Sequence, residues 1–225
     1  MNVKGVQVFW RRFARSKSAL LGFLLVLLVL VAAIFAPVLA PEDPYQINLL
    51  KRLAPPGPSE LLGRDDFGRD IFSRIIYGSR VSLQVGLFST LVALIIGIPL
   101  GLVAGYYGGR IDNVIMRFLD VMMAFPSILL ALTMIAAFGT NLSSVIMSIG
   151  LVAVPRYARI TRGSTLSVKG MEYIDAAEAL GAKTGRVLFK HILPNCLAPI
   201  IVYATMGMAS AILTEAGLSF LGMGT

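Results

Sequence analysis

The sequence predicts an all-α, polytopic membrane protein. Of its 225 residues, 56% are hydrophobic and only 14% are charged, and the mean hydropathy is +0.80. Several apolar runs approach the ~20 residues that an α-helix needs to cross ~30 Å of hydrocarbon. This composition excludes a soluble globular domain, so most of the apolar surface is expected to face lipid.

Five transmembrane helices are expected, at residues 18–40, 82–107, 126–138, 143–156 and 194–222. Residues 1–17 mix basic and aromatic side chains, which is typical of a segment at the cytoplasmic membrane interface. The apolar run that follows is too long for the ~7–15-residue core of a signal peptide, so we expect an uncleaved first span. The remaining blocks are then a loop at 41–81 and a main transmembrane domain at 82–225.

The loop at 41–81 is the one long polar connection. Five prolines between Pro41 and Pro58 break any helix in its first part. Its second part carries charges of both signs, from which we expect a small cap with ion pairs. The residues proposed for these pairs are Asp65, Asp66, Asp70, Arg69 and Arg74.

The formal charge of +8 reflects membrane orientation rather than nucleic-acid binding. Basic residues gather in 1–17 and 156–193, which flank apolar runs. With the N-terminus inside, 14 basic residues lie on the cytoplasmic side and six outside, in agreement with the positive-inside rule. The loop at 41–81 is then extracytoplasmic.

The sequence offers no catalytic site, metal site or cofactor site. The single cysteine, Cys196, rules out an internal disulfide, and the single histidine, His191, with no second thiol argues against a metal site. Lys183 and Thr184 follow one another, but the glycine spacing of a phosphate-binding loop is absent. We therefore expect the chain not to be an enzyme.

Two features within the spans have alternative interpretations. Gly97, Gly101 and Gly105 recur every four residues and predict a face for close helix packing, the alternative being chance. Glu215 is the one acid deep in a predicted span, where an unpaired charge is costly. It is a candidate for the translocation path, and the alternative is a structural hydrogen bond near the outer interface.

The cytoplasmic segment 169–194 predicts a helix–glycine–helix unit. Spacing at i, i+3, i+4 and i+7 makes one small apolar helix face from Tyr173, Ala176, Ala177 and Leu180. Gly181 follows where a helix C-terminus favours a left-handed residue. A second short helix starts at Thr184 or Gly185, and Pro194 is expected to end it. The face could contact a partner or the protein's own helix ends.

This segment resembles the EAA loop of ABC-importer permeases. Asp175-Ala176-Ala177-x3-Gly181 is followed, after nine intervening residues, by His191-Ile192-Leu193-Pro194. The sequence departs from the family pattern at Asp175, which replaces glutamate, and at His191, which replaces isoleucine. The resemblance implies a loop that couples to an ATPase, with contacts from Tyr173, Asp175, Ala176, Ala177, Leu180, Gly181, Leu193 and Pro194.

A second resemblance is to one branch of the ABC-importer permeases, the dipeptide, oligopeptide and nickel permeases. It is carried by the charged segment from Leu62 to Leu83, by Gly105-Tyr-Tyr-Gly-Gly109, and by the segment from Glu215 to Gly222. Arg64 stands where threonine is usual, which we expect to be a surface change of little consequence. The chain is most similar to the second permease subunit, the type with a short N-terminus. The resemblance implies six spans, and only five are expected here, so we expect this sequence to lack the last transmembrane helix of the family.

The resemblance implies a multi-pass permease subunit in the cell (inner) membrane that imports peptides. ATP hydrolysis is expected on cytoplasmic ATP-binding subunits, with a homologous second permease and an extracytoplasmic solute-binding protein as further partners. Nickel chelates are the alternative substrate. The alternative classes of protein are a secondary transporter, a channel and a membrane scaffold, none of which would need an ATPase.

Overall fold

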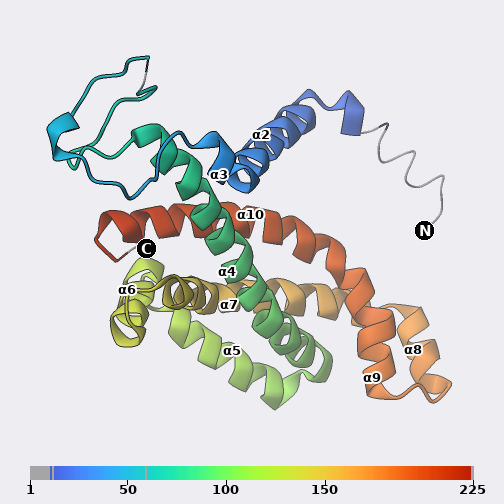
Figure 1. Ribbon diagram of the computed structural model, residues 1–225. Coiled ribbons are helices and arrows are strands. Elements are labelled where there is room, and N and C mark those ends of the chain that lie inside the picture. Colours follow the sequence, from blue (N-terminus) through green and yellow to red (C-terminus); the bar gives the residue numbers. More distant parts are fainter. Residues whose placement is uncertain (1–10, 12, 59, 224–225) are drawn as a thin grey trace. The chain divides into compact units, whose positions relative to one another are not determined.

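The computed structural model describes residues 11, 13–58 and 60–223, and in these residues it contains helices and no strand. The expected all-α fold is therefore confirmed. The chain divides into two compact units, Met1–Leu83 and Gln84–Thr225. Figure 1 shows the helices of each unit.

The first unit begins with the apolar helix α2, Lys17–Ile34. The Ser16 side chain accepts a hydrogen bond from the backbone N–H of Ala19 and so caps the helix start. Phe35 caps the end of α2, and a short helix, α3, follows at Ala36–Leu39 with Pro37 in its first turn. Proline is tolerated there because the first N–H groups of a helix have no partner within it.

The polar loop after α3 is held by ion pairs. Its first part contains only a short 3₁₀ turn, η1, at Leu49–Lys51. Asp65 pairs with Arg69 at 2.7 Å and with Arg74 at 2.5 Å, which confirms part of the expected set. Asp66 instead lies 3.9 Å from Arg52.

Arg64 contradicts the expectation of a surface position of little consequence. Its side chain is 2% exposed and pairs with Glu42 at 2.5 Å and with Glu60 at 3.4 Å. It also donates to the carbonyl oxygen of Gly68. A guanidinium has five donors, so one buried arginine can join three segments of the loop, which the local sequence does not reveal.

Helix α4, Ile71–Tyr107, begins eleven residues before the expected start of the second span. Asp70 accepts a hydrogen bond from the Ser73 backbone N–H at 2.7 Å, which caps the helix start. At 1.5 Å per residue the 37 residues extend about 55 Å, beyond the ~30 Å of the hydrocarbon layer. The part of 41–81 from Ile71 onward is therefore helical rather than loop.

The second unit is built around helix α7, Leu142–Lys169, which packs against helices α5, α6 and α10 (Figure 1). Helix α5 spans Gly109–Met123 and α6 spans Ser127–Phe138. The short helices α8, Glu172–Ala179, and α9, Thr184–Arg186, follow α7. A π-helical segment, η2, at Val187–Ile192 leads into α10, Leu193–Phe220.

Three helical stretches of the described chain are long and apolar enough to cross a membrane: Lys17–Ile34, Ile71–Tyr107 and Thr184–Phe220. Helices α5 and α6, bent by 88°, add a fourth when counted as one broken span. Helix α6 alone has 12 residues, about 18 Å, which is too short to cross. The fourth expected span, 143–156, is the first half of α7, which continues past it through Arg159 and Arg162 to Lys169. A count of five spans thus remains a prediction.

Pro194 does not end the second helix of the cytoplasmic segment, contrary to the expectation. The chain stays helical from Thr184 to Phe220, with Pro194 in the first turn of α10. The π-helical turns of η2 come directly before it, and the Leu193 N–H donates to the carbonyl of Leu188, five residues back. The wider turn accommodates the proline ring and its missing N–H without breaking the helix.

Candidate functional site

The predicted helix–glycine–helix unit consists of α8, a tight bend, α9 and η2. Gly181 has φ of +85°, a left-handed conformation that side chains with Cβ disfavour. Its N–H donates to the carbonyl of Glu178, and the Ala182 N–H donates to that of Ala177. This pair of bonds is a Schellman motif, which closes α8 and turns the chain back.

One face of α8 is exposed. Leu180 is 90% exposed and Tyr173 is 42% exposed, and Ala176 between them is also exposed. The Tyr173 hydroxyl accepts a hydrogen bond from Asn195 at 3.2 Å. These residues, with the half-buried Ala177, form a small apolar surface that the described residues leave uncovered, here called the α8 face.

The opposite side of α8 is anchored in a hydrophobic core, which sequence reasoning missed. Ile174 is 1% exposed and packs in one cluster with Leu102 of α4, Val168 of α7 and Ile192 of η2. Ile174 and Glu178 are four residues apart and share this side of the helix. This spacing, adjacent to the small-residue face, is the sequence signal from which a buried side of α8 could have been predicted.

A polar contact also fixes α8 to the last turn of α4. The Tyr106 hydroxyl donates to the Glu178 carboxylate at 2.8 Å. Lys169, at the end of α7, donates to the Tyr106 carbonyl at 2.6 Å, and its ammonium group lies 5.1 Å from the Tyr106 ring centroid. Three helices therefore meet at Tyr106, so α8 is positioned by both α4 and α7.

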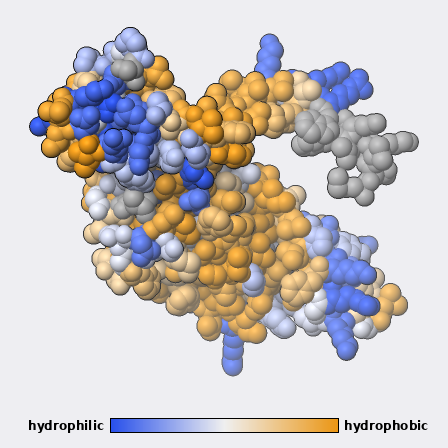
Figure 2. Space-filling model, in the orientation of Figure 1, coloured by the Kyte–Doolittle hydropathy of each residue, from blue (hydrophilic) through white to orange (hydrophobic). Residues whose placement is uncertain are grey.

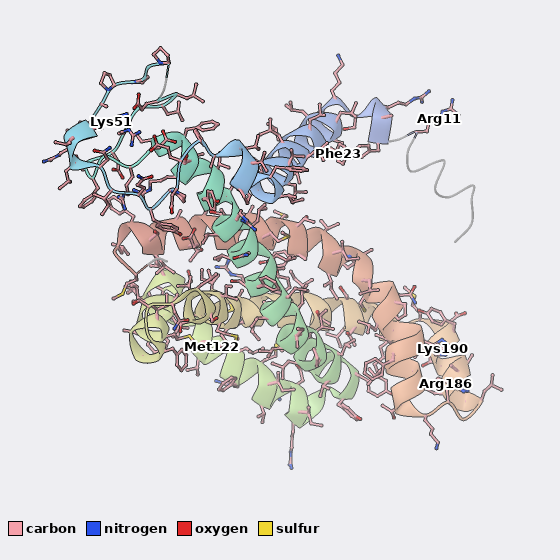
Figure 3. The ribbon with its side chains drawn as sticks, viewed as in Figure 1. Arg11, Phe23, Lys51, Met122, Arg186 and Lys190 are labelled. Atoms are coloured by element: carbon pink, nitrogen blue, oxygen red, sulfur yellow. The ribbon has the colours of Figure 1, made fainter. Side chains whose placement is uncertain are left out.

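The remaining predicted coupling residues lie around this unit. Asp175 is exposed on α8, Leu193 packs against the core that holds Ile174, and Pro194 is exposed. His191 is half-buried, and its carbonyl accepts a hydrogen bond from Asn195 at 2.6 Å. Figure 3 shows Arg186 and Lys190 on the same end of the second unit, and Figure 2 shows hydrophilic side chains gathered there, beside the hydrophobic middle of the unit.

Gly97, Gly101 and Gly105 lie directly against α7. A Cβ at Gly101 would be 2.4 Å from the Ala158 carbonyl oxygen, and one at Gly97 would be 2.8 Å from the Tyr157 Cβ. At Gly105 it would be 2.7 Å from the Thr165 Cβ. Only glycine permits this approach of α4 to α7.

Two ion pairs link α5 to α7. Asp112 accepts two hydrogen bonds from the Arg162 guanidinium, each 2.5 Å long, and Asp120 pairs with Arg159. A bidentate carboxylate–guanidinium pair fixes orientation as well as distance. The amphipathic helix α5 is therefore held along α7.

A cavity of about 230 Å³ lies between α4, α6, α7 and α10. Its lining includes Arg156, Tyr157, Ala211 and Thr214. Glu215 is 7% exposed but does not line this cavity, and within the described residues it makes no hydrogen bond or ion pair. Its assignment to the translocation path stays a prediction.

Residues 97–225 match the family of binding-protein-dependent transport system inner membrane components. Residues 6–56 match the N-terminal transmembrane domain of oligopeptide transport permease C. The chain is 47% identical to the dipeptide transport system permease protein DppC of Alkalihalophilus pseudofirmus, over 96% of this chain and 71% of that protein. It is 39% identical to the oligopeptide transport system permease protein OppC of Bacillus subtilis, over 95% of this chain and 70% of that protein.

Among solved structures, an inward-facing form of the MetNI methionine ABC transporter has the same fold. The TM-score is 0.57 at 22% identity, and the match covers 64% of this chain and 72% of that one. These similarities confirm the permease resemblance seen in the sequence. The chain belongs to the family of binding-protein-dependent transport system inner membrane components.

Proposed function

We propose that this chain is a permease subunit that carries peptides across the cell (inner) membrane, driven by ATP hydrolysis on separate subunits. The α8 face is the observation that carries this proposal. It is apolar and exposed, while the other side of α8 is fixed to α4 and α7. The names of the relatives, dipeptide and oligopeptide permeases, support peptides as the substrate class.

The α8 face is proposed to dock on a cytoplasmic ATP-binding subunit. Small side chains at Ala176 and Ala177 let a partner approach the helix closely, and Leu180 and Tyr173 supply apolar area to bury. Asp175 is exposed on the same helix and is proposed to meet a basic residue of the partner.

The proposed orientation places the N-terminus and the segment 169–194 in the cytoplasm. Basic residues on the segment, among them Arg186 and Lys190, are consistent with it. The loop before α4 then lies outside, where an extracytoplasmic solute-binding protein would deliver the peptide. A homologous second permease subunit would complete the path, since the relatives are named as components of transport systems.

Movement of the docked ATPase would be transmitted to the transmembrane helices through rigid helical elements. Helical structure is continuous from Thr184 to Phe220, and Ile174 locks α8 onto that helix and onto α7. A displacement of α8 would therefore tilt α7 and α10 together, as alternating access requires.

The test uses the importer reconstituted in proteoliposomes with its ATP-binding subunits, second permease and solute-binding protein. Labelled dipeptide should accumulate only with ATP and the solute-binding protein. Uptake without ATP would contradict the proposal and favour a secondary transporter. Uptake of a nickel chelate in place of dipeptide would show that nickel chelates, and not peptides, are the substrate.

Gly181→Val should uncouple ATP hydrolysis from uptake in the same assay. A β-branched residue in the left-handed region costs at least ~1–2 kcal/mol, so the bend would open and the α8 face would turn. Gly185→Val is the matched control, because Gly185 lies on the same segment with open space around it and ordinary backbone. Unchanged uptake by an assembled Gly181→Val complex would contradict the docking role.

A further inference from the structure

The cavity between α4, α6, α7 and α10 contains an arginine with no counter-ion. Arg156 is the one charged side chain of its lining in the part of the chain that the structure describes. It takes part in no ion pair there, although Arg159 and Arg162, one and two turns further along α7, each pair with an aspartate of α5. Arg156 is exposed and lines the cavity, so its guanidinium is available to an anionic ligand there.

Two buried hydroxyl groups face the same cavity. Thr90 is 5% exposed and Tyr157 is 2% exposed, and both line it. Neither hydroxyl has a hydrogen-bond partner among the described residues. The two are near enough to interact but do not meet hydrogen-bond geometry with each other. Since buried polar groups in proteins are almost always bonded, two unbonded hydroxyls in a cavity that a guanidinium also lines indicate a place for a ligand.

The position of the Tyr157 hydroxyl is set by its neighbours. Its ring packs edge-to-face on Tyr203, with centroids 5.1 Å apart. A Cβ at Gly207 would lie 1.9 Å from the hydroxyl oxygen, so glycine at this position of α10 leaves the room that the hydroxyl occupies. Tyr157 is therefore held rigidly toward the cavity rather than toward lipid.

We propose that Arg156, Tyr157 and Thr90 form a subsite that binds the carboxylate of a peptide. The guanidinium would hold both carboxylate oxygens, and the hydroxyls would donate to the same group or to the adjacent peptide carbonyl. About 230 Å³ is below the ~300–1,000 Å³ of pockets that enclose drug-sized ligands, so the subsite takes the end of a peptide and not the whole molecule. The assignment rests on the proposed peptide transport.

The test measures binding of labelled dialanine, and of its C-terminal amide, to the purified complex of permeases and ATP-binding subunits without the solute-binding protein. The amide keeps the shape of the ligand and loses its charge. Wild-type complex should bind the free acid at least about tenfold more tightly than the amide. Arg156→Gln should lose that preference by weakening acid binding alone.

Arg159→Gln is the matched control, because it removes an arginine one turn away that pairs with Asp120 and does not line the cavity. It should retain the preference for the acid. If Arg156→Gln does not assemble, Tyr157→Phe removes one hydroxyl and should weaken acid binding several-fold while the complex stays intact.

Several results would overturn the subsite. These are equal binding of acid and amide by wild type, equal loss of both ligands in Arg156→Gln, or the same loss in Arg159→Gln. Failure of the subsite is distinguishable from failure of the proposed function, because two separate measurements test them. ATP-dependent uptake of dipeptide by wild-type proteoliposomes tests the proposed function, and the binding preference for acid over amide tests the subsite.

Discussion

The hydroxyl group of Tyr106 donates a hydrogen bond to the carboxylate of Glu178 over 2.8 Å. The two residues are 72 positions apart, and they join the last turn of α4 to α8. Together with the burial of Ile174, this bond fixes which side of α8 faces the helices and which side stays exposed. The α8 face owes its orientation to α4 as much as to its own sequence.

Tyr106→Phe should loosen the coupling between ATP hydrolysis and transport. The substitution removes only the hydroxyl, and a hydrogen bond contributes ~0.5–1.5 kcal/mol net, so the ratio of peptide transported to ATP hydrolysed should fall about two- to tenfold. Tyr107→Phe is the control, because Tyr107 is 54% exposed and keeps its ring contact with Tyr106. An unchanged ratio in Tyr106→Phe would show that the bond is not needed for coupling.

Gly101→Ala should destabilise the second unit. The added Cβ would meet the Ala158 carbonyl at 2.4 Å and the Arg162 backbone nitrogen at 2.9 Å, and backbone atoms cannot move aside as a side chain can. Overpacking of this kind costs about 1–3 kcal/mol, measured as a lower unfolding temperature in detergent. Gly163→Ala, on α7 with open space around it, should leave the temperature nearly unchanged or raise it. Equal effects of the two substitutions would contradict the close packing of α4 on α7.

Arg162→Gln should destabilise the attachment of α5 to α7. The Asp112 side chain is 15% exposed and the Arg162 side chain is 33% exposed. The pair is therefore intermediate between an exposed and a buried ion pair, and its loss should lower the free energy of unfolding by about 1–2 kcal/mol. Exchanging the two residues, Asp112→Arg with Arg162→Asp, should restore part of the loss. Asp120→Asn at the more exposed pair should cost at most ~1 kcal/mol. An absence of recovery in the exchanged variant would mean that the geometry of α7, and not the charge pair, sets the stability.

The loop before α4 should lose order in acid. Burial raises the pKa of Asp65, but hydrogen bonds from the backbone and side chain of Arg69, from the Phe67 N–H and from Arg74 outweigh it and hold the pKa well below its ordinary value of 3.8. A carboxylate with a depressed pKa stabilises the fold above its unfolded-state pKa, and the contribution is lost as pH falls below it.

Proteolysis of this loop in the intact protein should therefore accelerate as pH falls below about 4. In Asp65→Asn the loop should be cut faster already at pH 7, with a smaller dependence on pH. Asp66→Asn, whose side chain is 72% exposed, is the control and should behave as wild type. Identical pH profiles for wild type and Asp65→Asn would show that another group controls the loop.

Local patterns in the sequence were sufficient for the membrane class, the family and the bend at Gly181. Apolar runs of membrane length, the small-residue spacing of α8 and the left-handed preference of glycine are properties of neighbouring residues, so they can be read without a partner in space. The glycine spacing in α4 also predicted a packing face, but not which helix would lie against it.

The tertiary structure alone decided the contacts between distant segments. Arg64 is buried because Glu42, Glu60 and the Gly68 carbonyl converge on it. Arg156, Tyr157 and Thr90 likewise share a cavity only because α4 and α7 cross. Side chains far apart in the chain acquire their burial, charge partners and cavities from helix packing, and no local pattern encodes that packing.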